Sequence, residues 1–115
     1  MTTDSHEEQT NWTGGRDSFG DFAPGLVHYT DAVLFDEVWE REGLSKRDRS
    51  LITIAALTAM GKTEQLNFHL DFGKKNGLTV EEIQEALLHL AFYAGWPNGM
   101  GAMGVAKKLF DTDEA

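Results

Sequence analysis

The sequence predicts an all-α protein of about five short helices. Apolar residues recur at helical spacing in five successive segments, capping residues and glycines separate these segments, and no segment alternates as a strand does. A chain of 115 residues suits one compact domain. Because the start of the chain is polar and contains glycine, we expect a flexible arm over residues 1–22, a helical domain over residues 23–110 and an acidic tail over residues 111–115.

The first two predicted helices differ in how much of their surface is apolar. The first begins at Pro24, which fits a first helical turn, and ends near Gly43. The second, "SKRDRSLITIAALTAM", opens with Ser45 and Asp48 in the register of a capping box. It is apolar nearly all round after its first turn, so we expect it to be the central and most buried helix.

The third predicted helix is the stretch "TEQLNFHLDFGKKNG". Thr63 can cap its start, and Asn76 with Gly77 can end it by offering a left-handed residue. His69 lies on the apolar arc of this helix at about 100° per residue. Gly73, one turn further on, leaves room beside the imidazole for a neighbouring helix or a small ligand.

The last two predicted helices meet at a broken corner. Thr79 and Glu82 form a capping box for the fourth helix, and Gly95 with Pro97 ends it. Asn98 can cap the fifth helix. Three glycines lower the helicity of this last segment, so close backbone packing must compensate or its start is loose: Gly99, Gly101 and Gly104.

Composition excludes several classes of function. The formal net charge is −9, and residues 1–8 and 111–115 hold six of the acids and no Lys or Arg. A mildly acidic body without a basic stripe argues against binding to nucleic acid or to an anionic membrane surface. No apolar run approaches the ~20 residues of a membrane helix, and the first residues do not resemble a signal peptide, so we expect a cytoplasmic protein. The absence of cysteine excludes disulfides, thiolate catalysis and cysteine-ligated metals.

His69 has three interpretations: a packed core residue, a metal ligand or a proton carrier. Spacing alone favours a hydrogen-bonded core histidine, because buried polar groups usually find partners. A metal site is unsupported, since no pair among His28, His69 and His89 is three or four residues apart. The proton carrier stays open as the functional alternative.

Two further features have both a structural and a functional interpretation. Arg47 and Arg49 stand at the start of a helix, where cations oppose the helix dipole, so they are either solvated or paired with acids of the first predicted helix, or they bind a carboxylate. The corner with Tyr93 and Trp96 is either an ordinary hydrophobic turn or the wall of a pocket.

The order and spacing of these segments resemble the carboxymuconolactone decarboxylase family. The resemblance rests on "GLSKRDRSLITIAAL", "EQLNFH" and "NGLTVEEIQEALLHLAFYAGWP", and it covers residues 41–97 and extends toward Phe110. It implies an alkylhydroperoxidase D-like helical fold that assembles as a homo-oligomer, commonly a trimer or hexamer, with sites near subunit contacts. In the redox branch of this superfamily a CxxC pair precedes the histidine, and Lys62 and Gln65 occupy those positions here. The resemblance is therefore to the cysteine-free branch.

That branch implies a cofactor-independent decarboxylase of aromatic catabolism, which acts on a small carboxylated lactone such as 4-carboxymuconolactone. Carried over to this sequence, His69 is the general acid/base, and Arg49 with Arg47 binds a carboxylate or the developing oxyanion. Tyr93 and Trp96 shape the pocket. No metal or cofactor is required.

One departure bears on the substrate, and one alternative bears on catalysis. The segment "NGMGAMG" is richer in glycine and methionine than the decarboxylase pattern, which indicates a reshaped pocket and a related lyase or isomerase substrate. The alternative is a non-catalytic helical oligomer that binds a small ligand or a partner, with His69 at an interface.

Overall fold

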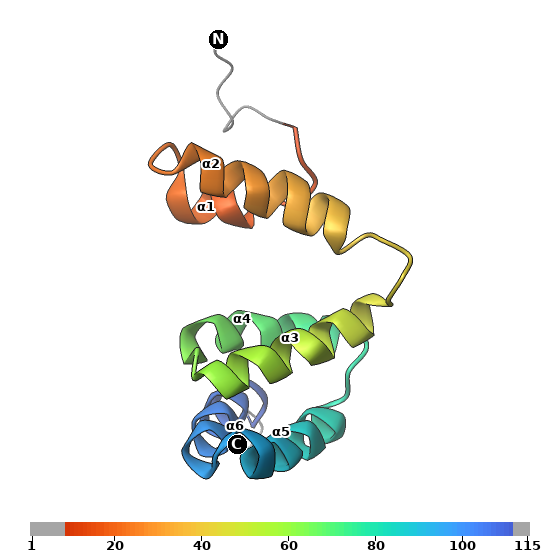
Figure 1. Cartoon of the computed structure of the whole chain (residues 1–115), viewed down its shortest axis with the longest axis vertical. Helices are drawn as coiled ribbons and strands as arrows, with labels where there is room; N and C mark the ends of the chain where they lie inside the picture. Colours follow the sequence, from red (N-terminus) through yellow and green to blue (C-terminus); the bar gives the residue numbers. More distant parts are fainter. Residues whose placement is uncertain (1–8, 112–115) are drawn as a thin grey trace. The chain divides into compact units, whose positions relative to one another are not determined.

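The computed structural model describes residues 9–111, and every regular element in this range is helical (Figure 1). The elements are α1 (Gly14–Phe19), α2 (Pro24–His28), the π-helical segment η2 (Tyr29–Val38), α3 (Lys46–Met60), α4 (Thr63–Lys75), α5 (Val80–Ala94) and α6 (Trp96–Phe110). The all-α prediction is confirmed. No helix within residues 9–111 is long and apolar enough to cross a membrane. The contacts divide the chain into two units, one ending at Leu44 and one beginning at Ser45.

The first unit contains a helix that the sequence did not predict. Residues 9–22, assigned above to the N-terminal arm, include α1, while residues 1–8 lie outside the described range. The buried carboxylate of Asp31 accepts hydrogen bonds from the backbone N–H groups of Gly15 at 2.6 Å and Arg16 at 3.0 Å. Asp31 therefore caps the first turn of α1 from a distant part of the chain, which local sequence patterns do not reveal.

The predicted first helix corresponds to α2 and η2, which follow each other without a break. Pro24 occupies the first turn of α2 as expected. The N–H of Trp39 donates to the carbonyl of Leu34, five residues back, which is the π-helical spacing. An aromatic stack also ties the segment before α1 to η2, with Trp12 4.1 Å from Phe35 between ring centroids.

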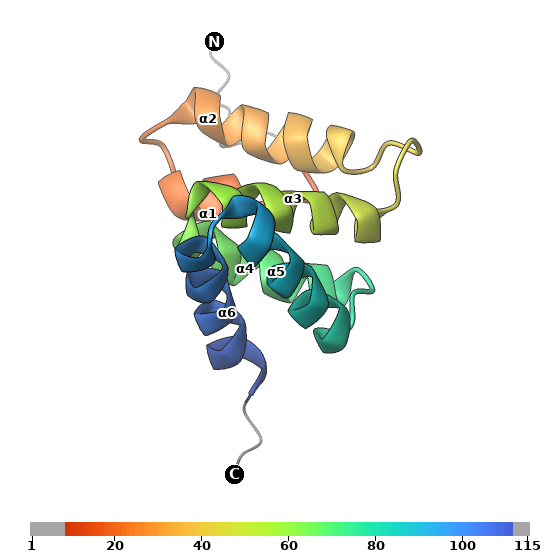
Figure 2. The ribbon, with the colours of Figure 1, turned by 60° about the horizontal axis from the view of Figure 1, so that its bottom comes forward.

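The second unit is built on the hairpin of α3 and α4, with α5 and α6 packed beneath it (Figures 1 and 2). Its core is formed by Ile54, Leu66, Leu70, Leu78, Ile83, Leu87, Ala102 and Ala106. Ser45 caps α3 by accepting from the N–H of Asp48, as predicted. The expectation that α3 is the most buried helix is not met in this chain, because α3 has three buried residues, as α4, α5 and α6 also have, and its Ile52 and Met60 are 56% and 60% exposed.

Helix α4 is fixed to α3 at its C-terminal end. Thr63 is the first residue of the helix and not its cap, since Lys62 holds the cap position without a side-chain hydrogen bond. Asn76 ends the helix and donates from Nδ2 to the hydroxyl of Ser50, which is fully buried in α3. This bond holds the start of α3 against the end of α4.

The corner between α5 and α6 depends on small residues. The capping box of Thr79 and Glu82 at the start of α5 is confirmed in both directions. Asn98 does not cap α6, because it lies inside the first turn and donates to the carbonyls of Ala94 and Ala59. A Cβ at Gly99 would lie 2.5 Å from the Cβ of Ala91, so the close packing expected of the glycine-rich segment is present at this position.

Candidate functional site

The two residues assigned above to catalysis project from the hairpin of α3 and α4. On α3, Leu51 and Ala55 face α5, because they line a groove together with residues of that helix. Arg49 is two residues before Leu51, which is a rotation of about 200° around the helix. Arg49 therefore lies on the side of α3 that is turned away from α5.

On α4, contacts on two sides fix the direction of His69. Lys74 faces α6, because its Nζ lies 5.4 Å from the centroid of the Phe110 ring, and Gly73 faces α3. His69 is rotated by about 140° from Lys74 and by about 40° from Gly73. It therefore lies beside α3 and away from α6.

Arg49 and His69 thus share the face of the hairpin that is turned away from α5 and α6. We call it the hairpin face, and the helical positions assign to it Arg49, Thr53, Ala56 and Met60 of α3 and Gln65, Phe68, His69 and Phe72 of α4. The face combines one permanent cation, one imidazole, an amide, a hydroxyl and apolar groups. Such a composition suits a small, partly apolar anion.

His69 is half-buried and has aromatic neighbours on its own helix. Its ring is perpendicular to that of Phe68, with centroids 4.9 Å apart, and lies edge-on to Phe72 at 6.2 Å. Burial lowers the pKa of the His69 imidazole below its usual value, because desolvation disfavours the charged form. The ring is therefore mostly neutral near pH 7 in the absence of a bound anion.

The start of α3 is held in a fixed geometry. Thr53 donates from its hydroxyl to the carbonyl of Arg49 at 2.7 Å, one turn earlier in the same helix. Arg49 is partly buried, so its guanidinium is less hydrated than a fully exposed one. A guanidinium in such surroundings binds a carboxylate or an oxyanion more strongly than a fully solvated cation does.

Arg47 lies on the other side of α3, apart from Arg49. Its guanidinium forms ion pairs with Glu82 of α5 and with Asp48. It borders a groove of about 480 Å³ between α3 and α5, whose rim also carries Glu85 and His89. Pairing with acids is the interpretation of Arg47 that this geometry favours, but these acids belong to α5 and α3, whereas acids of the first predicted helix were expected.

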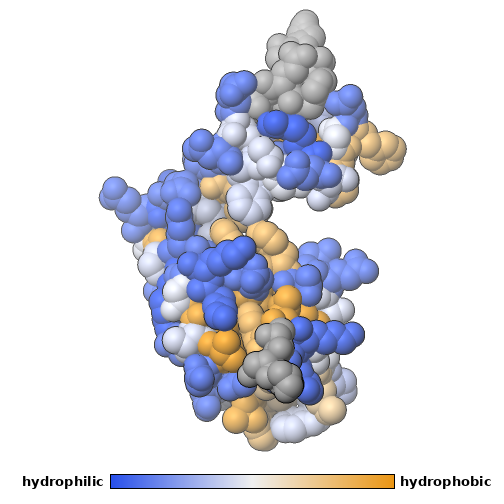
Figure 3. Space-filling view, turned by 180° about the vertical axis from the view of Figure 1, so that it is seen from behind, coloured by the Kyte–Doolittle hydropathy of each residue, from blue (hydrophilic) through white to orange (hydrophobic). Residues whose placement is uncertain are grey.

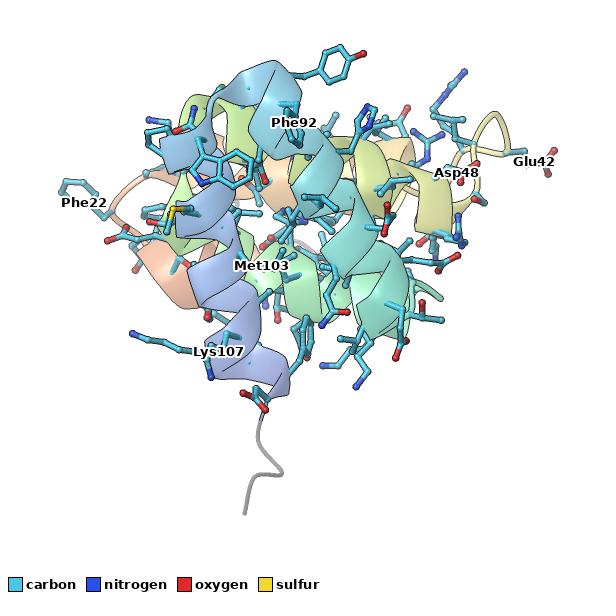
Figure 4. The ribbon with its side chains drawn as sticks, turned by 90° about the horizontal axis from the view of Figure 1, so that it is seen from below. Phe22, Glu42, Asp48, Phe92, Met103 and Lys107 are labelled. Atoms are coloured by element: carbon cyan, nitrogen blue, oxygen red, sulfur yellow. The ribbon has the colours of Figure 1, made fainter. Side chains whose placement is uncertain are left out.

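The aromatic corner belongs to the ends of α5 and α6. Tyr93 is 80% exposed and stacks on His89 with centroids 4.8 Å apart, and Trp96 contacts Phe92 edge-on at 5.4 Å. Figure 4 shows Phe92 near the C-terminal end of α5. The two predicted pocket residues thus lie in the α5–α6 corner and not on the hairpin face.

Gly73 does not leave room for a ligand. A Cβ at this position would lie 3.0 Å from Leu78 and 3.1 Å from Ile54, so core side chains already occupy the space beside it. Of the two uses that the sequence suggested for this space, close packing is the one observed.

Sequence reasoning missed two sets of residues. It treated Phe68 and Phe72 only as apolar positions. Helical spacing places Phe72, three residues after His69, beside the imidazole, whereas the contact of Phe68 with that ring is known only from the structure. It also grouped the two arginines, although a separation of two residues puts them on opposite sides of a helix. Among residues 9–111, no cluster of three or more metal-ligating side chains is formed.

Comparison with known proteins agrees with this architecture. Residues 24–108 match the carboxymuconolactone decarboxylase family. The chain is 37% identical over 94 residues to 4-carboxymuconolactone decarboxylase of Acinetobacter baylyi, a match that covers 82% of this chain and 70% of that protein. It is 39% identical over 74 residues to nitrosuccinic acid decarboxylase of Metarhizium robertsii, which covers 64% of this chain and 52% of that protein.

A third relative is an uncharacterized 15.0 kDa protein of Paracoccus denitrificans, 28% identical over 84 residues, or 71% of this chain and 63% of that protein. Two of the three relatives are thus named as decarboxylases of small acids. The family match spans well over half of the chain and includes the whole hairpin that carries Arg49 and His69. The chain therefore belongs to the carboxymuconolactone decarboxylase family.

Proposed function

We propose that this protein is a cofactor-independent decarboxylase of a small carboxylated lactone such as 4-carboxymuconolactone, or of a related acid. The observation that supports this most directly is that Arg49 and His69 occupy one face of the α3–α4 hairpin. The names of the two decarboxylase relatives support the same class of substrate.

The reaction needs two groups with the chemistry of these residues. The bond between the leaving carboxylate and its carbon breaks, and its electron pair flows through the ring alkene to the lactone carbonyl as carbon dioxide departs. Arg49 stabilises the resulting oxyanion by a charge-assisted hydrogen bond. His69, in its protonated form, then gives a proton to carbon, and solvent restores that proton for the next turnover.

The neutral resting state of His69 fits this sequence of steps. Desolvation lowers the pKa of the free imidazole. The negative charge that spreads over the substrate as carbon dioxide leaves favours the charged form of the ring and raises that pKa again, so the proton is taken up from solvent as the carbanion forms. The acid is then present only when there is a carbanion to protonate.

The test is a mass-spectrometric assay of 4-carboxymuconolactone, of nitrosuccinic acid and of saturated lactone acids with the purified protein. We expect carbon dioxide release from 4-carboxymuconolactone or from nitrosuccinic acid. For His69→Ala we expect kcat to fall by about 10²- to 10⁴-fold. Activity that is unchanged in His69→Ala would remove this residue from the mechanism. No turnover of any acid, together with saturable binding of one, would favour a non-catalytic binding protein.

We also propose that the protein works as a homo-oligomer, a trimer or a hexamer. Figure 3 shows hydrophobic side chains exposed between charged ones on the surface of the second unit. Several strongly exposed apolar side chains gather around the α5–α6 corner, where Phe92, Tyr93 and Met100 are 73%, 80% and 63% exposed. Apolar surface of this kind commonly marks a subunit contact. Light scattering coupled to size-exclusion chromatography measures the mass directly, and a monomer at micromolar concentration contradicts the proposal.

A further inference from the structure

The hairpin face has a polar side and an aromatic side. Phe68 and Phe72 stack on each other with centroids 5.1 Å apart and an interplanar angle of 26°. Both lie edge-on to the His69 ring. Phe68 is 42% exposed although it is a large apolar residue, so its ring contributes an apolar surface directly beside the imidazole.

We propose that Phe68 and Phe72 form the wall against which the leaving carboxylate is held, while Arg49 binds the oxygen that receives its electrons. This inference rests on the proposed function and deepens it, because it assigns each end of the substrate to one part of the face. The substrate class follows from this assignment. It comprises acids that, on losing carbon dioxide, leave a carbanion delocalised onto an oxygen acceptor, such as a lactone carbonyl or a nitro group.

The physical reason is the movement of charge during the reaction. In the ground state the negative charge is localised on the carboxylate, where water stabilises it well. In the transition state the charge has left that group and is spread toward the acceptor oxygen. An apolar wall at the carboxylate destabilises the ground state more than the transition state. A cation at the acceptor stabilises the transition state more than the ground state. In this orientation both effects therefore lower the activation barrier.

The opposite orientation would work against the reaction. A guanidinium on the leaving carboxylate stabilises the ground state, and that interaction is lost as neutral carbon dioxide forms. The phenyl rings would then face the developing oxyanion, to which they offer no hydrogen bond. His69 lies beside the rings in the observed geometry, so its imidazole is close to the departing group and can protonate the delocalised carbanion once carbon dioxide has left.

The test is to make the wall polar and to measure kcat and KM separately. For Phe68→Gln we expect kcat to fall by about tenfold while KM stays the same or decreases, since a polar wall solvates the carboxylate of the bound substrate. Phe68→Leu keeps the wall apolar and should retain kcat within about threefold. The matched control is Phe19→Gln in α1, because Phe19 is also 42% exposed and lies outside the hairpin face.

Phe72→Gln provides a second variant, and thermal unfolding of each variant separates loss of fold from loss of rate. An equal fall in kcat for Phe68→Leu and Phe68→Gln would overturn the inference, as would a rise in KM with unchanged kcat. These outcomes leave the decarboxylase function itself intact. Failure of the wild-type protein to release carbon dioxide from any acid overturns the proposed function first, and this inference with it.

Discussion

Two arginine and histidine pairs lie on opposite sides of α3, and their surroundings differ. On the hairpin face, Arg49 accompanies His69, which is half-buried and makes T-shaped contacts with two aromatic rings. In the groove between α3 and α5, Arg47 is paired with Glu82 and Asp48, and His89 stacks on exposed Tyr93. The same residue types therefore meet different electrostatic conditions within one unit.

The comparison teaches that the side of α3 on which an arginine lies decides which groups surround it. Glu82 and Asp48 already neutralise Arg47, so an incoming carboxylate would have to compete with both. The arginine on the hairpin face is grouped by helix geometry with apolar residues and an imidazole. A substrate anion is expected there, since desolvated surroundings strengthen its attraction to the cation.

The largest effect should come from removing the cation on the hairpin face. We expect Arg49→Gln to lower kcat/KM by about 100-fold, because it removes a charge-assisted hydrogen bond to the oxyanion. Arg47→Gln should lower kcat/KM much less, because Arg47 lies on the other side of α3 and is already paired with Glu82 and Asp48. Steady-state kinetics of both variants measures the difference. Equal losses would show that the two sides of α3 act as one site.

A core substitution should affect both sides of α3 together. Gly73→Ala places a methyl group 3.0 Å from the end of the Leu78 side chain and 3.1 Å from that of Ile54, so these buried side chains must give by a few tenths of an ångström. We expect a loss of about 1–3 kcal/mol in the free energy of unfolding, measured by chemical denaturation. Gly104→Ala is the control, because its added Cβ meets no atom within 4 Å. An unchanged free energy of unfolding for Gly73→Ala would mean that α3 packs less tightly on α4 than these distances indicate.

The pH dependence of stability should contain a contribution from His69. Its pKa is lowered in the folded protein, so the unfolded chain binds more protons and the free energy of unfolding falls as the pH drops through 6.5. His69→Gln should remove this contribution. Denaturation at about pH 5.5 and about pH 7.5 tests the difference. An NMR titration midpoint of His69 at or above 6.5 in the free protein would contradict the desolvated environment.

The smallest effect is expected in the groove. The pKa of Glu82 is lowered, first by the hydrogen bond from the N–H of Thr79 and also by Arg47. The stability that Glu82 contributes is therefore present above its usual pKa and is lost as the pH falls below it. Glu82→Gln keeps the cap and removes the charge, so its melting temperature should be slightly lower than that of the wild type at neutral pH and should converge with it in acid. A constant difference at all pH values would point to the cap and not to the ion pair.

Local signals were sufficient where the partners of a residue are near it in the sequence. The capping box of Thr79 and Glu82 and the cap at Ser45 involve side chains and backbone groups three residues apart, so the sequence predicts them correctly. The five predicted helices likewise follow from the period of their apolar residues. The prediction of His69 and Arg49 as catalytic residues stays a prediction, although both lie on one face.

Local signals failed where the partner is distant. Helix α1 depends on Asp31, sixteen residues after Gly15, and Asn98 bonds back to Ala59 across the unit. Neither contact has a signature in the neighbouring residues.

The sequence by itself determined the helical class, most of the helix starts, the family and the absence of thiol chemistry, because all of these depend on residue type and short spacing. Only the tertiary structure decided which side of α3 faces α5, and with it that Arg47 is neutralised by Glu82 while Arg49 shares a face with His69. The reason is geometric. A helical period gives the angle between two side chains, but only packing against neighbouring helices shows which of those directions meets a charge, a core or an open face.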